Sequence, residues 1–230
     1  MWRFIISILF VASPLLVRAQ LFKPLEVGRS PFVRISVDPT LPLKSFLQEA
    51  DIYGFEGTID SEIKQNLFLM GGLGFSNTAI AEGTYDYTSS GMFGMIGADL
   101  NLTKYQNPKD RNIFFMGLHY GFAVLSHEAT GVSISNYWGD YNTQVSSESH
   151  TASWLEISMG TKAEAAKNIF IGWTADAKFR THLSDGDMKP YYVPGLGKTD
   201  SNFSFDISFF VSYAITMKPK KQKPEVDDLD

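Results

Sequence analysis

Cysteine is missing from this chain. None of its 230 residues is a cysteine, so a disulfide framework and a thiolate metal site are both excluded. The same absence excludes a lipid anchor attached through a cysteine. The fold must therefore be held together by packing, hydrogen bonds and ion pairs alone.

A surplus of positive charge is missing as well. The chain has 20 Lys and Arg against 25 Asp and Glu, for a formal net charge of -5 at pH 7. This balance lacks the basic footprint of a nucleic-acid-binding protein. The 4 histidines and the scattered acids also lack the spacing of metal ligands. We therefore expect no nucleic-acid partner, no metal and no other cofactor.

Long hydrophobic runs are confined to the first twenty residues. Arg3 precedes an apolar stretch over 4–17, and residues 17–19 (Val-Arg-Ala) place small side chains where a signal peptidase cuts. The stretch is too short for a comfortable membrane-spanning helix. We expect a signal peptide over 1–19, with an uncleaved anchor helix as the alternative, and a segment over 20–31 that leads into the fold. An exported chain without disulfides fits a Gram-negative envelope better than a eukaryotic secretory route.

Large apolar side chains are nevertheless abundant, and they alternate with small or polar ones. The clearest case is the stretch 113–124, I-F-F-M-G-L-H-Y-G-F-A-V, in which the even positions are all large and apolar while the odd ones include Gly117, His119 and Gly121. A period of two indicates a β-strand with two unlike faces. Aromatics at 14% and 19 glycines, spread over such strands, are typical of a transmembrane barrel.

The same alternation recurs often enough to define a complete fold. It predicts strands over 32–38, 51–59, 67–77, 92–102, 113–124, 153–163, 169–182 and 205–215. Short turns are expected near 64–66, 104–112 and 164–168, and longer polar loops near 79–90, 126–150 and 183–203. Short turns at one end and long loops at the other are characteristic of outer-membrane barrels. The sequence therefore predicts an all-β protein, an eight-stranded antiparallel up-and-down transmembrane β-barrel over 32–217, followed by a charged periplasmic tail over 218–230.

The period alone does not say which face is outside. A soluble lipocalin-like binding barrel also alternates, with its apolar face turned inward. Three features favour a membrane barrel: small residues on the polar face, charges of both signs on that face, and Tyr53, Tyr120, Trp173 and Tyr213 on the apolar face, suited to interfacial girdles. The tail over 218–230 is also too charged and proline-rich to form the helix that lipocalins pack on their barrel.

The charges of the polar face predict a network that fills the lumen. Eight-stranded barrels have interiors just wide enough for side chains, and buried charges need partners. We expect Arg34 of the first strand to pair with Glu56 of the second. The predicted lumen network comprises Arg34, Asp38, Glu56, Asp99, His119, Glu156, Lys162, Asp176, Lys178, Arg180 and Asp206.

Several residues also carry the resemblance of the chain to a known group. They are the early Arg34-x-Ser-x-Asp38, the later Glu56, and the run over 66–75, N-L-F-L-x-G-x-L-G-F. With the signal peptide, this pattern resembles the small uncharacterised outer-membrane barrel proteins of Bacteroidota. The resemblance implies an eight-stranded barrel without an assigned activity. The chain departs from many such barrels in not ending on an aromatic residue, which leaves an internal insertion signal, expected over 209–213.

Catalytic interpretations find little support in this sequence. His119 has the chemistry of a general base but lies on the small-residue face, where a structural role is more common. His182 and Ser184 share a face and resemble the histidine and serine of outer-membrane lipid A deacylases, although the flanking residues do not match. We therefore expect no catalytic residues, with a lipid-modifying enzyme as the alternative.

The expected function lies at the outer surface. The barrel is predicted to be a structural or interaction protein of the Gram-negative outer membrane, in contact with its lipids and, through its long loops, with surface ligands or other envelope proteins. Tyr137, Trp138 and Tyr141 are the candidate loop contacts, because aromatic side chains stack on sugars or on partner proteins.

A filled lumen has a direct electrical consequence. Because the predicted network occupies the interior, the purified protein should show no stable single-channel conductance in a planar lipid bilayer. A reproducible open level in such recordings would contradict a plugged lumen.

Overall fold

Every long element of the described residues is a β-strand. The computed structural model describes residues 31–40, 51–82, 85–105, 109–136, 139–186 and 188–217, without the side chains of 51, 81–85 and 132–148. The strands are β1 (Phe32–Asp38), β2 (Asp51–Lys64), β3 (Leu67–Glu82), β4 (Tyr85–Asn101), β5 (Ile113–Asn136), β6 (Gly139–Ala166), β7 (Ile169–Leu183), β8 (Tyr192–Val193), β9 (Gly197–Lys198) and β10 (Phe203–Thr216).

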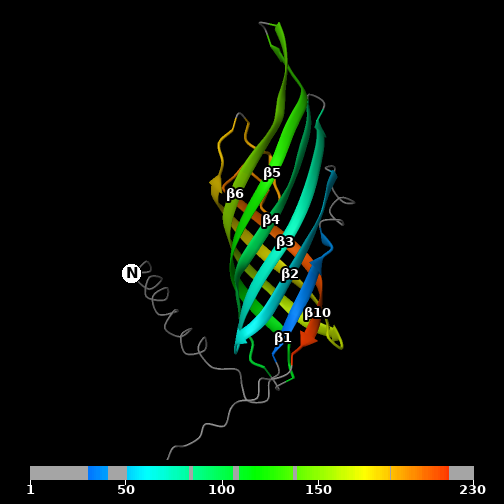
Figure 1. Cartoon of the computed structure of the whole chain (residues 1–230), viewed down its shortest axis with the longest axis vertical. Helices are drawn as coiled ribbons and strands as arrows, with labels where there is room; N and C mark the ends of the chain where they lie inside the picture. Colours follow the sequence, from blue (N-terminus) through cyan, green and yellow to red (C-terminus); the bar gives the residue numbers. More distant parts are fainter. Residues whose placement is uncertain are drawn as a thin grey trace, which may run out of the picture.

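In the part of the chain that the structure describes, eight of these strands close a barrel. The order is β1-β10-β7-β6-β5-β4-β3-β2, with every neighbouring pair antiparallel, and the pairing of β1 with β10 completes the ring. Figure 1 shows the tilted strands wound around a single axis. The predicted all-β, eight-stranded antiparallel barrel is therefore confirmed.

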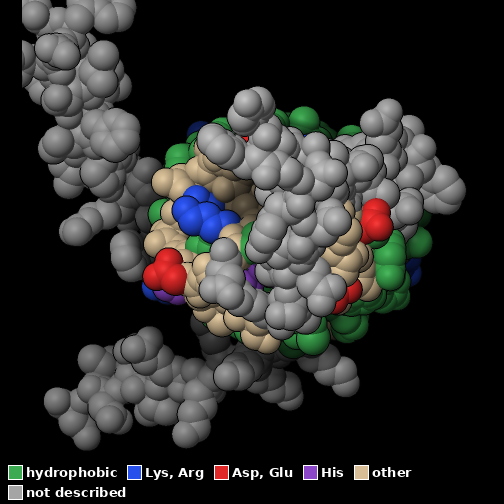
Figure 2. Space-filling view, turned by 90° about the horizontal axis from the view of Figure 1, so that it is seen from above, with side chains coloured by type: hydrophobic (Ala, Val, Ile, Leu, Met, Phe, Trp, Pro, Cys, Tyr) green, Lys and Arg blue, Asp and Glu red, His purple; other side chains and the backbone are tan. Residues whose placement is uncertain are grey.

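The alternation of the sequence becomes an inside and an outside. In β5, Leu118 and Phe122 are 55% and 53% exposed, whereas His119 between them is 4% exposed. The same holds around the ring, so that the outer wall is apolar (Figure 2, green). The prediction that the apolar face of each strand points outward is correct.

The short turns close one end of the barrel, called here the turn end. Asn66 and Asn168 have positive φ values of 66° and 64°, and asparagine tolerates this left-handed conformation better than most residues. Phe32 of β1 pairs with Thr216 of β10 at the same end. The sheet therefore begins and finishes beside its tight turns.

The opposite end, called the hairpin end, differs from the prediction. The polar stretches expected as loops near 79–90 and 126–150 instead continue the strands, because β3 and β4 pair as far as Glu82 and Tyr85 and β5 and β6 as far as Asn136 and Gly139. A strand of about 9–11 residues spans a membrane, yet β5 has 24 residues and β6 has 28. The change from apolar to polar residues in the sequence therefore marks where the apolar wall ends, and the strands continue past that point. Figure 1 shows the β5–β6 ribbon extending beyond the barrel.

The third predicted loop, near 183–203, also contains structure. Its β8–β9 hairpin turns inward, and Val193 and Leu196 are 0% and 3% exposed. They pack against Phe93 and Trp154, which point into the lumen from β4 and β6. Gly195 has a φ of 77° and lies so close to Phe93 that a Cβ there would sit 2.6 Å from its ring. The β8–β9 hairpin, called here the stopper, therefore fills the lumen at the hairpin end of the barrel.

Some predictions fall outside the described residues. They are the signal peptide over 1–19, nearly all of the segment over 20–31, the tail over 218–230, and the loop contacts Tyr137 and Trp138; of Tyr141 only the backbone is described. Among the helices of the described residues, none is both long enough and apolar enough to cross a membrane.

Trp154 provides a test of the stopper. Its side chain is 0% exposed and packs under the β8–β9 hairpin, so Trp154→Ala should lower the free energy of unfolding by about 3–5 kcal/mol. Leu118→Ala, on the exposed outer wall, is the matched control and should cost much less. Urea unfolding in detergent, followed by the heat-modifiable gel mobility of folded barrels, measures both. Equal losses would show that the stopper contributes little packing.

Candidate functional site: the charged lumen

Charged side chains fill the middle of the lumen between two apolar clusters. The cluster at the turn end contains Phe32, Phe68, Ile113, Phe115, Phe170 and Ala214. The cluster at the hairpin end contains Phe93, Met95, Ala123, Leu125, Ala152, Trp154, Val193 and Leu196. The charges between them are thus screened from water at both ends, which makes pairing among them essential.

Asp60 joins two cations near the turn end. Its Oδ1 accepts from Arg34 Nε and lies 2.8 Å from Nη2, while its Oδ2 accepts from Lys162 Nζ at 2.7 Å. The side chains of Arg34 and Asp60 are both 0% exposed. The guanidinium also lies over the ring of Phe68, with 4.9 Å to the centroid. Three strands, β1, β2 and β6, are connected through this one carboxylate.

His119 connects two further carboxylates in the centre. Its Nε2 lies 2.8 Å from Asp99 Oδ1 and its Nδ1 lies 2.9 Å from Glu156 Oε1. Ser158 Oγ donates to the same Glu156 oxygen at 3.0 Å. Because both ring nitrogens face carboxylate oxygens, both must donate, and the ring is positively charged in this arrangement. His119 is therefore a fixed cation between β4 and β6.

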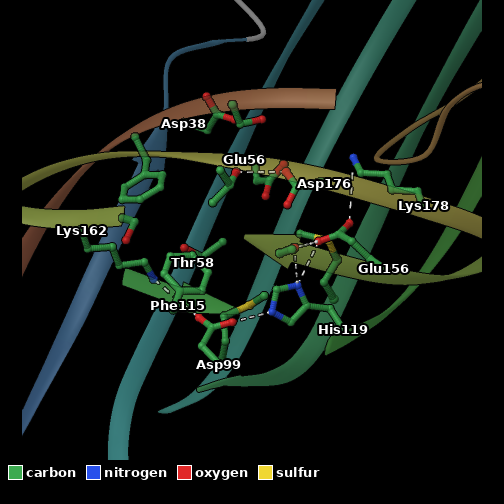
Figure 3. Close-up of a pocket in the computed structure, with 17 residues that line it drawn as sticks. Asp38, Glu56, Thr58, Asp99, Phe115, His119, Glu156, Lys162, Asp176 and Lys178 are labelled. Carbon is green, nitrogen blue, oxygen red and sulfur yellow. Dashed lines mark hydrogen bonds and ion pairs between the residues drawn. The ribbon is translucent and has the colours of Figure 1, made fainter. Parts of the chain in front are cut away.

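Longer ion pairs join these groups into a continuous series, called here the charge ladder. Lys162 Nζ lies 3.8 Å from Asp99 Oδ2, and Lys178 Nζ lies 3.9 Å from Glu156 Oε2. Positive and negative groups alternate along it, in the order Arg34, Asp60, Lys162, Asp99, His119, Glu156, Lys178. Figure 3 shows the part of this series from Lys162 to Lys178. Lys178 also donates to the carbonyl of Gly195 at 2.7 Å. The ladder thus runs from the aromatic cluster of the turn end to the stopper hairpin.

The predicted pairing of Arg34 with Glu56 is wrong. The β1–β2 register places Arg34 opposite Asp60, and Asp38 opposite Glu56. The choice of partner depends on this register, which β1 and β2 establish only when they pair. Asp60 was missed because the second strand was expected to end at residue 59, although Asp60 and Glu62 continue its alternation.

Glu56 lies in the lumen but outside the ladder, and so do three other members of the predicted network. Asp38 accepts from the backbone N–H of Thr40 at 2.6 Å. Asp176 accepts from Thr174 Oγ1 at 3.0 Å, and Asp206 lies beside the cavity of the hairpin end.

Arg180 was predicted to belong to the lumen network, but it has a different role. Its guanidinium donates to the carbonyl of Thr199 at 3.0 Å and to Asn202 Oδ1. Both acceptors belong to the connection between β7 and β10. Arg180 therefore anchors the segment that carries the stopper.

Two adjacent cavities lie inside the described part of the barrel. One, of about 70 Å³, lies beside His119 and Glu156. The other, of about 270 Å³, lies between the barrel wall and the β8–β9 hairpin. Their linings share Asp38, Glu56, Lys178 and Ser208. Burial raises the pKa of Tyr192 in this hairpin to about 12, so its phenol stays neutral at ordinary pH.

Ser184 and His182, the pair on which the alternative of a lipid-modifying enzyme was based, do not contact each other through any hydrogen bond of the described residues. His182 is exposed and opposes Ser153 across the β6–β7 sheet. Ser184 Oγ lies 3.1 Å from His150 Nδ1 and accepts from the backbone N–H of Thr151 at 3.0 Å. The serine hydroxyl thereby extends the β6–β7 pairing beyond the last strand residue.

The stopper contacts were the part that sequence reasoning missed. Trp154, Phe93 and Met95 were not assigned to the lumen, although each falls on the inward parity of its strand. The sequence feature that could have identified them is that the inward positions of these strands change from polar to apolar residues toward the hairpin end.

An eight-stranded closed barrel with an apolar outer wall and a filled, charged lumen is a barrel of the outer-membrane type. Residues 1–220 match the family model described as "Domain of unknown function (DUF6048)". The chain belongs to this family. Among the curated proteins compared with it, none matches.

The chain is also similar to several solved structures. A major outer membrane protein from Thermus thermophilus is 10% identical, with a TM-score of 0.47, covering 82% of this chain and 100% of its own. The N-terminal β-barrel domain of Pseudomonas aeruginosa OprF is 9% identical, with a TM-score of 0.33 and coverages of 82% and 99%. Acinetobacter baumannii CarO2 is 12% identical, with a TM-score of 0.38 and coverages of 82% and 99%. Likenesses this distant carry no functional conclusion.

The ladder predicts which charge pairs are coupled. Arg34→Ala and Asp60→Ala should each destabilise the barrel by about 3–5 kcal/mol, because each leaves a buried charge unpaired. The double variant should lose less than the sum of the two. Arg34→Ala with Glu56→Ala is the control pair, and its losses should add. Urea unfolding of all variants in detergent measures the coupling. Additive losses of stability for Arg34→Ala and Asp60→Ala would show that this first ion pair of the ladder is not coupled.

Proposed function

We propose that this protein is a β-barrel of the Gram-negative outer membrane whose lumen is plugged by charged side chains, with a structural or interaction role carried by its hairpin end. The resemblance in sequence favours a source among the Bacteroidota, and the N-terminal pattern favours export by a cleaved signal peptide. The proposed partners are the membrane lipids around the wall and, at the end where β5 and β6 project beyond it, surface ligands or envelope proteins.

The observation that carries this proposal is the apolar outer wall. Leu73, Met92 and Ile96 are 70%, 69% and 59% exposed, and comparable side chains surround all eight strands. Water-soluble monomers rarely expose contiguous apolar patches larger than a few hundred Å². A lipid bilayer is the environment that solvates such a band, while the closed ring satisfies the backbone hydrogen bonds that lipid cannot.

The filled lumen supports a role other than transport through the barrel. Apolar clusters occlude both ends of the charge ladder, and the stopper hairpin is tied to Lys178. A transported molecule would have to displace paired, buried charges. The surfaces left for function are therefore the lipid-facing wall and the hairpins, where β5 and β6 project beyond the wall.

We also propose that the chain is not an enzyme, keeping the lipid hydrolase as the alternative to test. A serine nucleophile needs an activating base and a free path to substrate. Ser184 has His150 beside it, but its Oγ is also held by the N–H of Thr151. This arrangement favours a structural hydroxyl, and unchanged lipid A acylation in Ser184→Ala would support that role.

A charge placed on the wall tests the membrane location. Leu118 lies mid-strand and is 55% exposed, so Leu118→Arg should cost about 2–4 kcal/mol if this face meets lipid. The same change on a soluble barrel would fall within about 0.5 kcal/mol. Glu128→Arg, exposed on β5 beyond the wall, is the matched control and should be tolerated.

Fractionation completes the test. The parent should remain in the outer-membrane pellet after a carbonate wash and dissolve only in detergent. Recovery of the mature chain in the soluble fraction, together with a harmless Leu118→Arg, would overturn the proposal.

A further inference from the structure

The two adjacent cavities are lined by more acidic than basic side chains, and some of these acids have no cation beside them. Together they are called here the acidic chamber, and Asp38, Glu56 and Asp176 line it. Figure 3 shows these three carboxylates gathered on the side of the cavity away from Asp99 and His119. Among the described Lys, Arg and His residues, none lies within 4.0 Å of any of the three.

The arrangement of Asp38 and Glu56 is unfavourable as it stands. They are directly opposite each other in the β1–β2 register and both face inward. Two ionised carboxylates in this position would repel each other, so the pair is stable only with a proton or a cation between them. Lys178, the cation that lines both cavities, already pairs with Glu156 and donates to Gly195. Lys198, which also lines the larger cavity, lies over the ring of Tyr191 and forms no ion pair with either acid. Neither Asp38 nor Glu56 therefore has a cation as its partner.

A second observation points to a missing polar partner, which a hydrogen-bond donor could supply. Ser36 is 3% exposed and lines the chamber, and its Oγ has no hydrogen-bond partner. It precedes Asp38 by two residues on the same face of β1, opposite Thr58. Buried hydroxyls are almost always bonded. Ser36, Asp38 and Glu56 thus present three acceptors on one patch of the lumen wall.

We propose that the acidic chamber binds a small primary ammonium ion. An –NH₃⁺ group carries one positive charge and three donors, which match the Ser36 hydroxyl and the two carboxylates. The larger cavity, of about 270 Å³, offers Ile52, Phe93 and Leu196 to an apolar body attached to the ammonium. A chelated metal fits less well, because the described residues contain no group of three or more acidic or histidine ligands placed to hold one.

The inference does not depend on the membrane location and is tested on the folded barrel in detergent. The probe is n-butylammonium chloride, titrated calorimetrically into the parent at constant ionic strength maintained with NaCl. The parent should bind it saturably. Tetramethylammonium chloride, which has the charge but no N–H donor, should bind at least about tenfold more weakly, as expected for the loss of charged hydrogen bonds.

Variants locate the site. Glu56→Gln and Asp38→Asn should each weaken butylammonium binding by about tenfold or more, and Ser36→Ala by a smaller factor. Glu164→Gln, an exposed acid at the turn end, is the matched control and should bind like the parent. Heat-modifiable mobility verifies that each variant is folded, and Asp38→Asn serves if Glu56→Gln does not fold.

Three results would overturn the inference. The first is that butylammonium gives no saturable heat with the parent. The second is that Glu56→Gln and Asp38→Asn both bind butylammonium as tightly as the parent does. The third is that the parent binds tetramethylammonium as tightly as butylammonium.

Discussion

Every feature of the lumen depends on one constraint, which is that a buried charge needs a partner. The charge ladder contains cations and anions from six strands and lies between two apolar clusters. Asp60 and His119 each satisfy this constraint with two opposite charges at once. Since the partners come from different strands, the ladder also fixes the register in which those strands meet.

The wall and the lumen result from the same backbone geometry. A period of two sends successive side chains to opposite faces, so each strand contributes to both environments. This is why Leu118 and His119, adjacent in sequence, occupy an apolar outer wall and a charged interior respectively. The proposed functions at the wall, at the hairpins and in the acidic chamber therefore occupy separate surfaces of one sheet.

The alternation predicted the barrel, the inward face and the lumen position of most charged residues, because these follow from parity along a single strand. The ion-pair partners could not be predicted in this way, since the partner of Arg34 depends on the register between β1 and β2. Strand ends beyond the wall were also missed, because polar residues in an exposed ribbon look like a loop. The stopper was missed for a third reason: its contacts join segments such as Phe93 and Val193 that are distant in sequence.

The closure of β1 on β10 has a consequence for how the chain folds. Phe32 of the first strand pairs near Thr216 of the last, and its ring lies in one cluster with Phe170 of β7. Contacts so distant in sequence form slowly, because a long segment must be ordered before they are made. The aromatic surroundings of Arg34 cannot be complete until the ring shuts. Until then its guanidinium remains hydrated, so the step that closes the barrel is also the step that drives water from its interior.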